Sequence, residues 1–66
     1  MANFREVNRA IRAEFSGLDI QAVRGEGYVY FDGDDAEGIA SIYAHPRSTP
    51  TADMICMAIE HINEAK

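Results

Sequence analysis

Four acidic side chains lie between two aromatic and β-branched segments, in the stretch GYVYFDGDDAEGIASIYA of residues 27–44. Carboxylates at this spacing could bind a hard cation, could face the basic surface of another protein, or could simply be solvated in a turn. The four residues are Asp32, Asp34, Asp35 and Glu37. All three roles fit the composition of the stretch.

The calcium-binding role fails on spacing. An EF-hand loop that starts at Asp32 would have Ala36 at its third ligand position, Glu37 where glycine is required, and Tyr43 in place of the final glutamate. Other cation geometries stay open, but Asp and Gly are also the residues that hairpin loops favour. We therefore predict no metal site and no cofactor.

A nucleophilic site would need a cysteine or serine beside a base. Cys56 and His61 are five positions apart in a predicted helix, about 140° around its axis, so their side chains should not face each other. We expect Cys56 in the core, His61 on the helix surface and His45 at a strand end. The sequence therefore predicts no catalytic residues and no enzyme.

Nucleic acid is not an expected direct ligand. The chain has 66 residues with a formal net charge of −5, which repels phosphate backbones. The segments GEGYVY and YVYF contain glycines and aromatic rings, but only Arg24 and Arg47 could supply positive charge beside them. The first interpretation of Tyr28, Tyr30 and Tyr43 is that they are strand-forming residues on a solvent-exposed face of the sheet. The second is that they form a protein-binding patch.

Chain length and composition predict one small domain over residues 1–66. No apolar run is long enough to span a membrane, and the charged N-terminal segment is not followed by the apolar region of a secretory signal. The single cysteine fits a reducing compartment. We expect a soluble, cytoplasmic protein with no membrane contact.

Two amphipathic helices are expected at the ends of the chain. Asn3 and Glu6 have capping-box spacing, and Ser16-Gly17 supplies a C-cap. Between them Phe4, Val7, Ile11 and Phe15 form the apolar side, opposite a basic stripe of Arg5, Arg9 and Arg12. The second helix is expected to be capped by Thr49, with Pro50 in its first turn, and to bury Ile55, Ile59 and Ile62, flanked by Ala52, Cys56 and Ala58.

Three strands are expected between the helices, in the segments LDIQAVR, YVYF and IASIYA of residues 18–24, 28–31 and 39–44. A two-residue type II′ turn at Gly25-Glu26 is favoured over a three-residue loop, because the longer loop would bring a polar Gln21 beside Phe31 on the core side. The expected buried pairs are Ala22 with Val29, Ile20 with Phe31, Val29 with Ile42 and Phe31 with Ala40. The expected outer pairs are Tyr28 with Tyr43 and Tyr30 with Ser41. The predicted fold class is α+β, in the order α-β-β-β-α, with two helices on one face of a three-stranded antiparallel meander.

The central third of the chain contains a G-x-G-Y-x-Y-F strand, an acidic or glycine-bearing loop and an S-[VI]-Y strand, here Gly25, Gly27, Tyr28, Tyr30, Phe31, Ser41, Ile42 and Tyr43. In this pattern it resembles short uncharacterised proteins of bacteriophages, plasmids and other mobile elements. The resemblance implies no catalytic or binding residue. It implies a context in which small acidic proteins inhibit host defence or nucleic-acid enzymes, as anti-CRISPR proteins do.

The leading functional hypothesis is a non-enzymatic module that binds a host protein with a basic surface. The acidic side chains of residues 32–37 would stand in for phosphates, and the three tyrosines would add apolar contact. The alternative is a small structural homodimer without a foreign target, and an enzyme or metal-binding protein ranks third. If a mobile element encodes the chain, it would act in the host cytoplasm.

Overall fold

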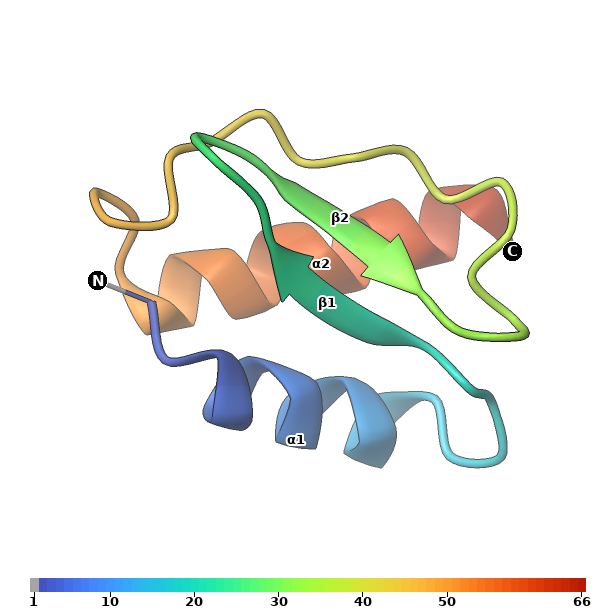
Figure 1. The fold of residues 1–66 in the computed structure, drawn as a ribbon. Coiled ribbons are helices and arrows are strands. Elements are labelled where there is room, and N and C mark those ends of the chain that lie inside the picture. Colours follow the sequence, from blue (N-terminus) through green and yellow to red (C-terminus); the bar gives the residue numbers. More distant parts are fainter. Residues whose placement is uncertain (1) are drawn as a thin grey trace.

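An antiparallel hairpin packs against two helices in the computed structural model, which describes residues 2–66 (Figure 1). The elements are α1 (Phe4–Glu14), β1 (Gln21–Arg24), β2 (Val29–Asp32) and α2 (Thr51–Ala65). Helix α1 runs beside β1, α2 crosses behind the hairpin, and the segment that joins β2 to α2 returns along β2 (Figure 1). The fold is α+β, with a single sheet of two strands among the described residues.

Helix α1 forms as its sequence predicts. The side chain of Asn3 accepts hydrogen bonds from the backbone N–H groups of Arg5 and Glu6, which satisfies two donors that a helix N-terminus leaves open. Val7 and Ile11 are buried, one turn apart on the side that faces the core. The C-cap residue is Phe15, before the expected Ser16-Gly17 cap, and Gly17 follows it with a φ of 92°.

The β1–β2 turn differs from the prediction by one position. Gly25 pairs with Tyr28, donating its N–H to the Tyr28 carbonyl at 2.9 Å, so the two turn residues are Glu26 and Gly27. Gly27 has a φ of 79°, whereas Gly25 is not among the glycines with positive φ. The residue with positive φ is therefore the second of the two turn residues, whereas the expected type II′ turn requires a positive φ at the first.

This turn shifts the β1–β2 register by two residues. Ala22 lies opposite Phe31 instead of Val29, and Val23 lies opposite Tyr30. Because side chains alternate with a period of two, a shift of two changes every partner but keeps every side chain on its predicted face. Ala22 and Val29 are accordingly buried, and Tyr30 is exposed.

The predicted third strand is wrong, and with it the three-stranded meander. Residues 39–44 contribute one isolated bridge, between Val29 and Ile42, closed by two backbone hydrogen bonds of 2.9 and 2.8 Å. The next pair of a regular ladder would join Phe31 to Ala40. The Ala40 carbonyl instead lies 2.9 Å from His61 Nδ1, and the His61 ring packs on Phe31 with centroids 6.4 Å apart. The imidazole thus bonds to the Ala40 carbonyl, which in a third strand would have accepted a hydrogen bond from β2.

The buried side of α2 is rotated from the predicted stripe. Met54, Ala58 and Ile62 are completely buried, whereas Ile55 and Ile59 are only half-buried. Cys56 is exposed and is not part of the core. Apolar residues cover more than half of the circumference of α2, so periodicity alone could not identify the side that meets α1 and the hairpin. Neither helix within residues 2–66 is long and apolar enough to cross a membrane.

The expected Thr49 cap is also wrong. Helix α2 begins at Thr51, with Pro50 in the N-cap position and no side-chain cap. The Thr49 hydroxyl donates to the carbonyl of His45 at 2.8 Å, which stabilises the turn before the helix. The Thr51 hydroxyl accepts the N–H of Asn3 at 3.0 Å, and this bond ties the start of α1 to the start of α2.

The outer edge of β1 is covered by a single side chain of α1. Asn8 donates from Nδ2 to the Ala22 carbonyl at 3.2 Å and accepts the Ala22 N–H through Oδ1 at 2.7 Å. The amide therefore pairs with the strand edge as another strand would. At this position it prevents the edge-to-edge pairing to which open sheets are prone.

Candidate functional site

Three tyrosines form a continuous exposed surface on the hairpin, called here the tyrosine surface and made of Tyr28, Tyr30 and Tyr43. Their exposed fractions are 36%, 39% and 87%. Tyr28 lies in the middle: its ring centroid is 6.0 Å from that of Tyr30 and 6.4 Å from that of Tyr43. The expectation that all three rings are exposed, and that Tyr28 meets Tyr43, is confirmed. Their predicted role as partner-binding residues stays a prediction.

The strand register explains why these rings gather on one face. Val29 faces the core, so the neighbouring Tyr28 and Tyr30 face outward. The Val29–Ile42 bridge brings Tyr43 alongside Tyr28 by the same alternation. One isolated bridge is therefore sufficient to bring the third ring to the tyrosine surface without a third strand.

The Tyr28 ring packs directly over Gly25. A β-carbon added at Gly25 would lie 2.6 Å from Cζ of Tyr28 and 2.7 Å from its Cε1. The ring thus covers the residue opposite it in the hairpin, and it can do so because that residue has no side chain. The position of the middle ring is set by the backbone of β1 as well as by its neighbouring rings.

The acidic residues 32–37 form a loop that folds back on Asp19, a residue that the sequence analysis did not single out. The backbone N–H of Asp19 donates to Asp35 Oδ2 at 2.7 Å, and Asp19 Oδ2 accepts the N–H of Asp34 at 3.0 Å. The Asp19 carbonyl also accepts the N–H of Asp35 at 3.1 Å. Asp35 is half-buried, and one of its carboxylate oxygens is engaged within the fold. The observed role of Asp35 is therefore to stabilise the acidic loop.

The other three predicted acidic residues face solvent. Asp32, Asp34 and Glu37 are exposed. Asp32 ends β2 two positions after Tyr30, so alternation places it on the same face as the tyrosine surface. Within residues 2–66 no three His, Cys, Asp or Glu side chains are grouped so that they could hold a metal ion.

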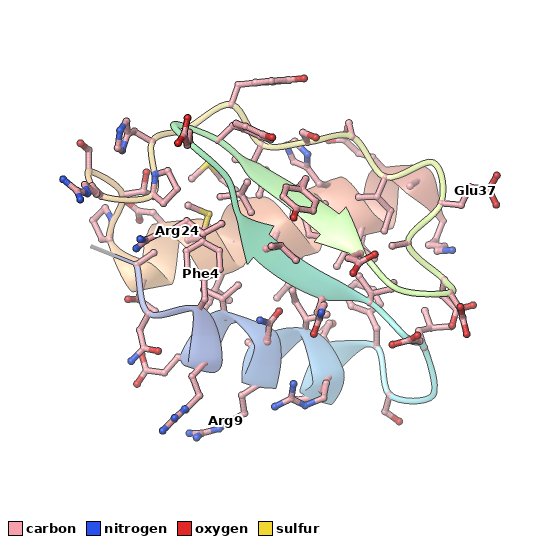
Figure 2. The ribbon with its side chains drawn as sticks, viewed as in Figure 1. Phe4, Arg9, Arg24 and Glu37 are labelled. Carbon is pink, nitrogen blue, oxygen red and sulfur yellow. The ribbon has the colours of Figure 1, made fainter. Side chains whose placement is uncertain are left out.

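Charge is distributed unevenly along the molecule. Arg24, at the hairpin turn, and Glu37, in the acidic loop, lie toward opposite ends, while Arg9 projects from the outer side of α1 (Figure 2). The molecule measures 29 × 20 × 17 Å along its principal axes. Electrostatic interactions in physiological salt are screened over about 8 Å, which is much shorter than the long axis of the molecule. A partner at one end is therefore influenced mainly by the charges of that end.

The two residues that could have formed a nucleophile–base pair have separate surroundings. Cys56 is exposed on α2, whereas His61 is half-buried and bonded to the carbonyl of Ala40. The expectation that His61 lies on the helix surface is therefore only partly met. Its observed role is structural, because it connects α2 to the segment beyond β2.

Sequence reasoning missed two features of this region. Asp19 and Asn8 both use polar side chains to bind backbone groups of distant segments. Asn and Asp are common in such roles, but the identity of a backbone partner 14 or 15 residues away leaves no local sequence signal. Comparison of the chain with models of protein families, with curated proteins and with solved structures found no match.

Proposed function

We propose that the chain is a non-enzymatic module that binds a protein with a basic surface through its tyrosine surface. The observation that carries this proposal is the row of three contacting, exposed rings on the outer face of the hairpin. Tyrosine is enriched among the residues that dominate protein–protein binding energies, because it offers a large apolar area and a polar tip with few rotatable bonds.

The middle ring is already ordered before any partner binds. Tyr28 is confined by Tyr30 on one side, by Tyr43 on the other and by Gly25 beneath it. A side chain that is held in one position loses less conformational entropy when it enters an interface. Tyr43, which is 87% exposed, has the largest apolar area to bury against a partner.

The acidic end of the molecule favours a basic partner. Asp32 lies on the same face as Tyr30, and the exposed Asp34 and Glu37 continue beyond it in the acidic loop. Opposite charge across an interface steers association and selects among partners. A partner with lysine or arginine side chains beside an apolar patch would complement both parts of this face.

The most concrete form of the proposal is an inhibitor of a host defence or nucleic-acid-handling complex. A protein that binds nucleic acid presents basic side chains for phosphates, and carboxylates can occupy the same positions. The resemblance of the strand pattern to short proteins of mobile elements supports this form. In this form the module would compete with nucleic acid for its target.

The proposal predicts that partner capture depends on the tyrosine surface. A tagged chain incubated with a bacterial lysate should retain a basic protein. Tyr28→Ser combined with Tyr43→Ser should weaken this binding about 30-fold or more, because even one residue that dominates an interface contributes about 2 kcal/mol or more. The affinity of the purified pair would be measured by calorimetry. Added DNA should displace the module from the target.

The matched control is Leu18→Ser, because Leu18 is an apolar residue outside the tyrosine surface with a similar exposed fraction, 38%. This control should bind as the wild type does. Equal binding by all three proteins would contradict the proposal. A chain that retains only untagged copies of itself would support the homodimer instead, and sedimentation at about 100 μM would detect such a dimer if its free energy of association reached about −6 kcal/mol.

A further inference from the structure

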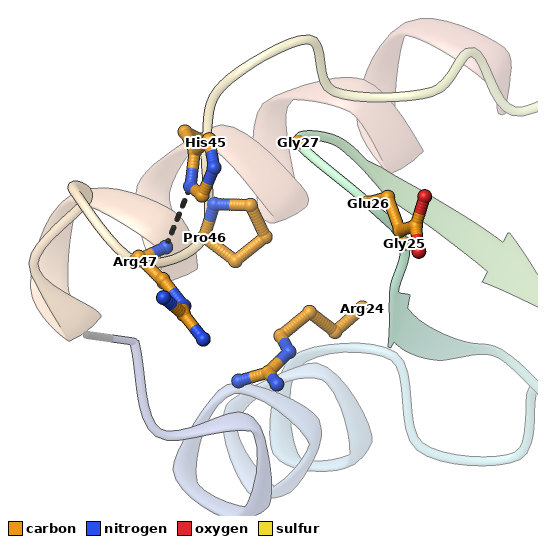
Figure 3. Close-up of a pocket in the computed structure, with 7 residues that line it drawn as sticks. All are labelled: Arg24, Gly25, Glu26, Gly27, His45, Pro46 and Arg47. Atoms are coloured by element: carbon orange, nitrogen blue, oxygen red, sulfur yellow. Dashed lines mark hydrogen bonds between the residues drawn. The ribbon is translucent and has the colours of Figure 1, made fainter.

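A pocket of about 490 Å³ opens between the β1–β2 turn and the loop that precedes α2 (Figure 3). Residues 24–27 line one side and residues 45–47 line the other. The volume falls in the range of pockets that hold small molecules. Arg24 and Arg47, the two residues expected from the sequence to supply positive charge beside the glycine and aromatic segments, both line this pocket.

Both guanidinium groups of the pocket extend toward the same space. Arg24 lies opposite Val29 in the β1–β2 register, so its side chain leaves the sheet on the face that the helices cover, and it approaches Arg47 beneath Pro46 (Figure 3). Glu26 also lines the pocket, but its carboxylate points away from both guanidinium groups (Figure 3). In a chain with a net charge of −5, this is a local concentration of positive charge.

His45 adds a third donor to the same pocket. Its Nδ1 accepts the backbone N–H of Arg47 at 3.2 Å. In a neutral imidazole one nitrogen accepts and the other carries the proton, so this bond leaves Nε2–H as a donor.

The loop that carries His45 and Arg47 is held by hydrogen bonds at several points. The His45 carbonyl accepts the Ser48 N–H at 3.0 Å and the Thr49 hydroxyl at 2.8 Å, and the Pro46 carbonyl accepts the Ala2 N–H at 3.0 Å. Pro46 is completely buried. Donors that are fixed before a ligand arrives bind it at a lower entropic cost.

Gly27 in the opposite wall leaves space beside His45. A β-carbon added at Gly27 would lie 3.8 Å from Cδ2 of His45, so the turn and the loop are in close proximity. Gly27 presents backbone without a side chain there, which allows a ligand to approach the turn.

We propose that this pocket binds the phosphate group of a small molecule. Two guanidinium groups and an imidazole N–H, supplied by two separate segments, suit an anion with several oxygens and more than one negative charge. A phosphate group can accept hydrogen bonds from two guanidinium groups at once, whereas a carboxylate is satisfied by one bidentate arginine. The pocket requires no protein partner, so the site does not depend on the function of the tyrosine surface.

The test is a titration of the isotopically labelled chain with pyrophosphate, followed by amide and arginine side-chain NMR signals at constant ionic strength. Saturable shifts are expected at residues 24–27, at His45 and at Arg47. A nucleoside monophosphate should shift the same signals, which would show that an organic phosphate fits the pocket, whereas acetate should bind at least about tenfold more weakly. If only pyrophosphate shifts them, the pocket holds an inorganic anion alone and the proposal is overturned.

Arg24→Gln combined with Arg47→Gln should weaken pyrophosphate binding at least about tenfold, since each substitution removes one charge-assisted contact. Arg5→Gln combined with Arg9→Gln removes the same charge from α1 and should leave binding unchanged. Equal weakening in both double variants, or shifts spread evenly over the chain, would show general charge attraction and overturn the site. An unchanged amide spectrum of each free variant outside the substituted positions would show that the fold is retained.

Discussion

Gly33→Ala should lower the melting temperature by about 10 °C or more. Gly33 has a φ of 129°, and a β-carbon placed there would overlap the carbonyl oxygen of Asp19. A positive φ costs an L-residue about 1–2 kcal/mol, and forcing an extra carbon into packed atoms costs about 1–3 kcal/mol. Since 1 kcal/mol shifts the midpoint of a domain of this size by about 4–8 °C, the combined effect is large. Thermal unfolding followed by far-UV circular dichroism measures it.

Gly38→Ala is the matched control for this prediction. Gly38 follows the acidic loop with a φ of 86°, but a β-carbon added there would meet no atom within 4 Å. The control therefore also places an alanine at a positive φ but without the contact with Asp19, and its midpoint should fall by less than that of Gly33→Ala. Equal losses in the two variants would mean that the overlap with the Asp19 carbonyl oxygen adds no cost, which would contradict the prediction.

Ile62→Ala should remove about 2–5 kcal/mol from the free energy of unfolding, the usual cost of truncating a buried aliphatic side chain. Ile62 is 0% exposed and lies with Met54 and Ala58 on the buried side of α2. A domain of 66 residues has a total stability of roughly 3–10 kcal/mol, so this loss could leave a large unfolded population at 37 °C. Urea unfolding monitored by circular dichroism gives the change directly.

Ile59→Ala distinguishes the observed buried face of α2 from the stripe expected from periodicity. Ile59 is half-buried, so its truncation should cost clearly less than that of Ile62. The expected stripe would have placed both residues in the core. Equal losses would therefore favour the sequence-based assignment and contradict the observed rotation of the helix.

The features that local sequence determines were predicted correctly. The Asn3 cap and the periodicity that buries Val7 and Ile11 depend on residues within a few positions of one another. The outward direction of Tyr28 and Tyr30 follows from the alternation of β2, and it tolerates the two-residue shift in register. The Val29–Ile42 pair was also predicted correctly.

The features that depend on distant residues could not be predicted in this way. The third strand is lost where His61 of α2 takes the Ala40 carbonyl, an interaction across 21 residues. The acidic loop is shaped by Asp19, and the edge of β1 is covered by Asn8. Alternating strand residues indicate which face a side chain takes, but they do not indicate which polar groups compete for the backbone.

The predicted site residues also differ in how far local sequence determined their positions. The tyrosine surface follows from alternation, but the acidic residues could not be assigned separate roles from composition. Asp35 accepts a backbone hydrogen bond inside the loop, whereas Asp32 is exposed beside the tyrosine surface. Both belong to the same short acidic segment, but Asp32 ends β2, whereas Asp35 lies beyond the strand and is positioned by its hydrogen bonds with Asp19.

The most direct test of the central proposal is a cross-saturation NMR measurement on the labelled chain bound to its captured protein partner. Saturation of the unlabelled partner should reduce the signals of Tyr28, Tyr30 and Tyr43 and of the adjacent Asp32, because these residues would lie at the interface. Signals of Arg5 and Arg9 on α1 should keep their intensity. Loss of signal on α1, with the three tyrosines unaffected, would contradict the assignment of the tyrosine surface as the binding site.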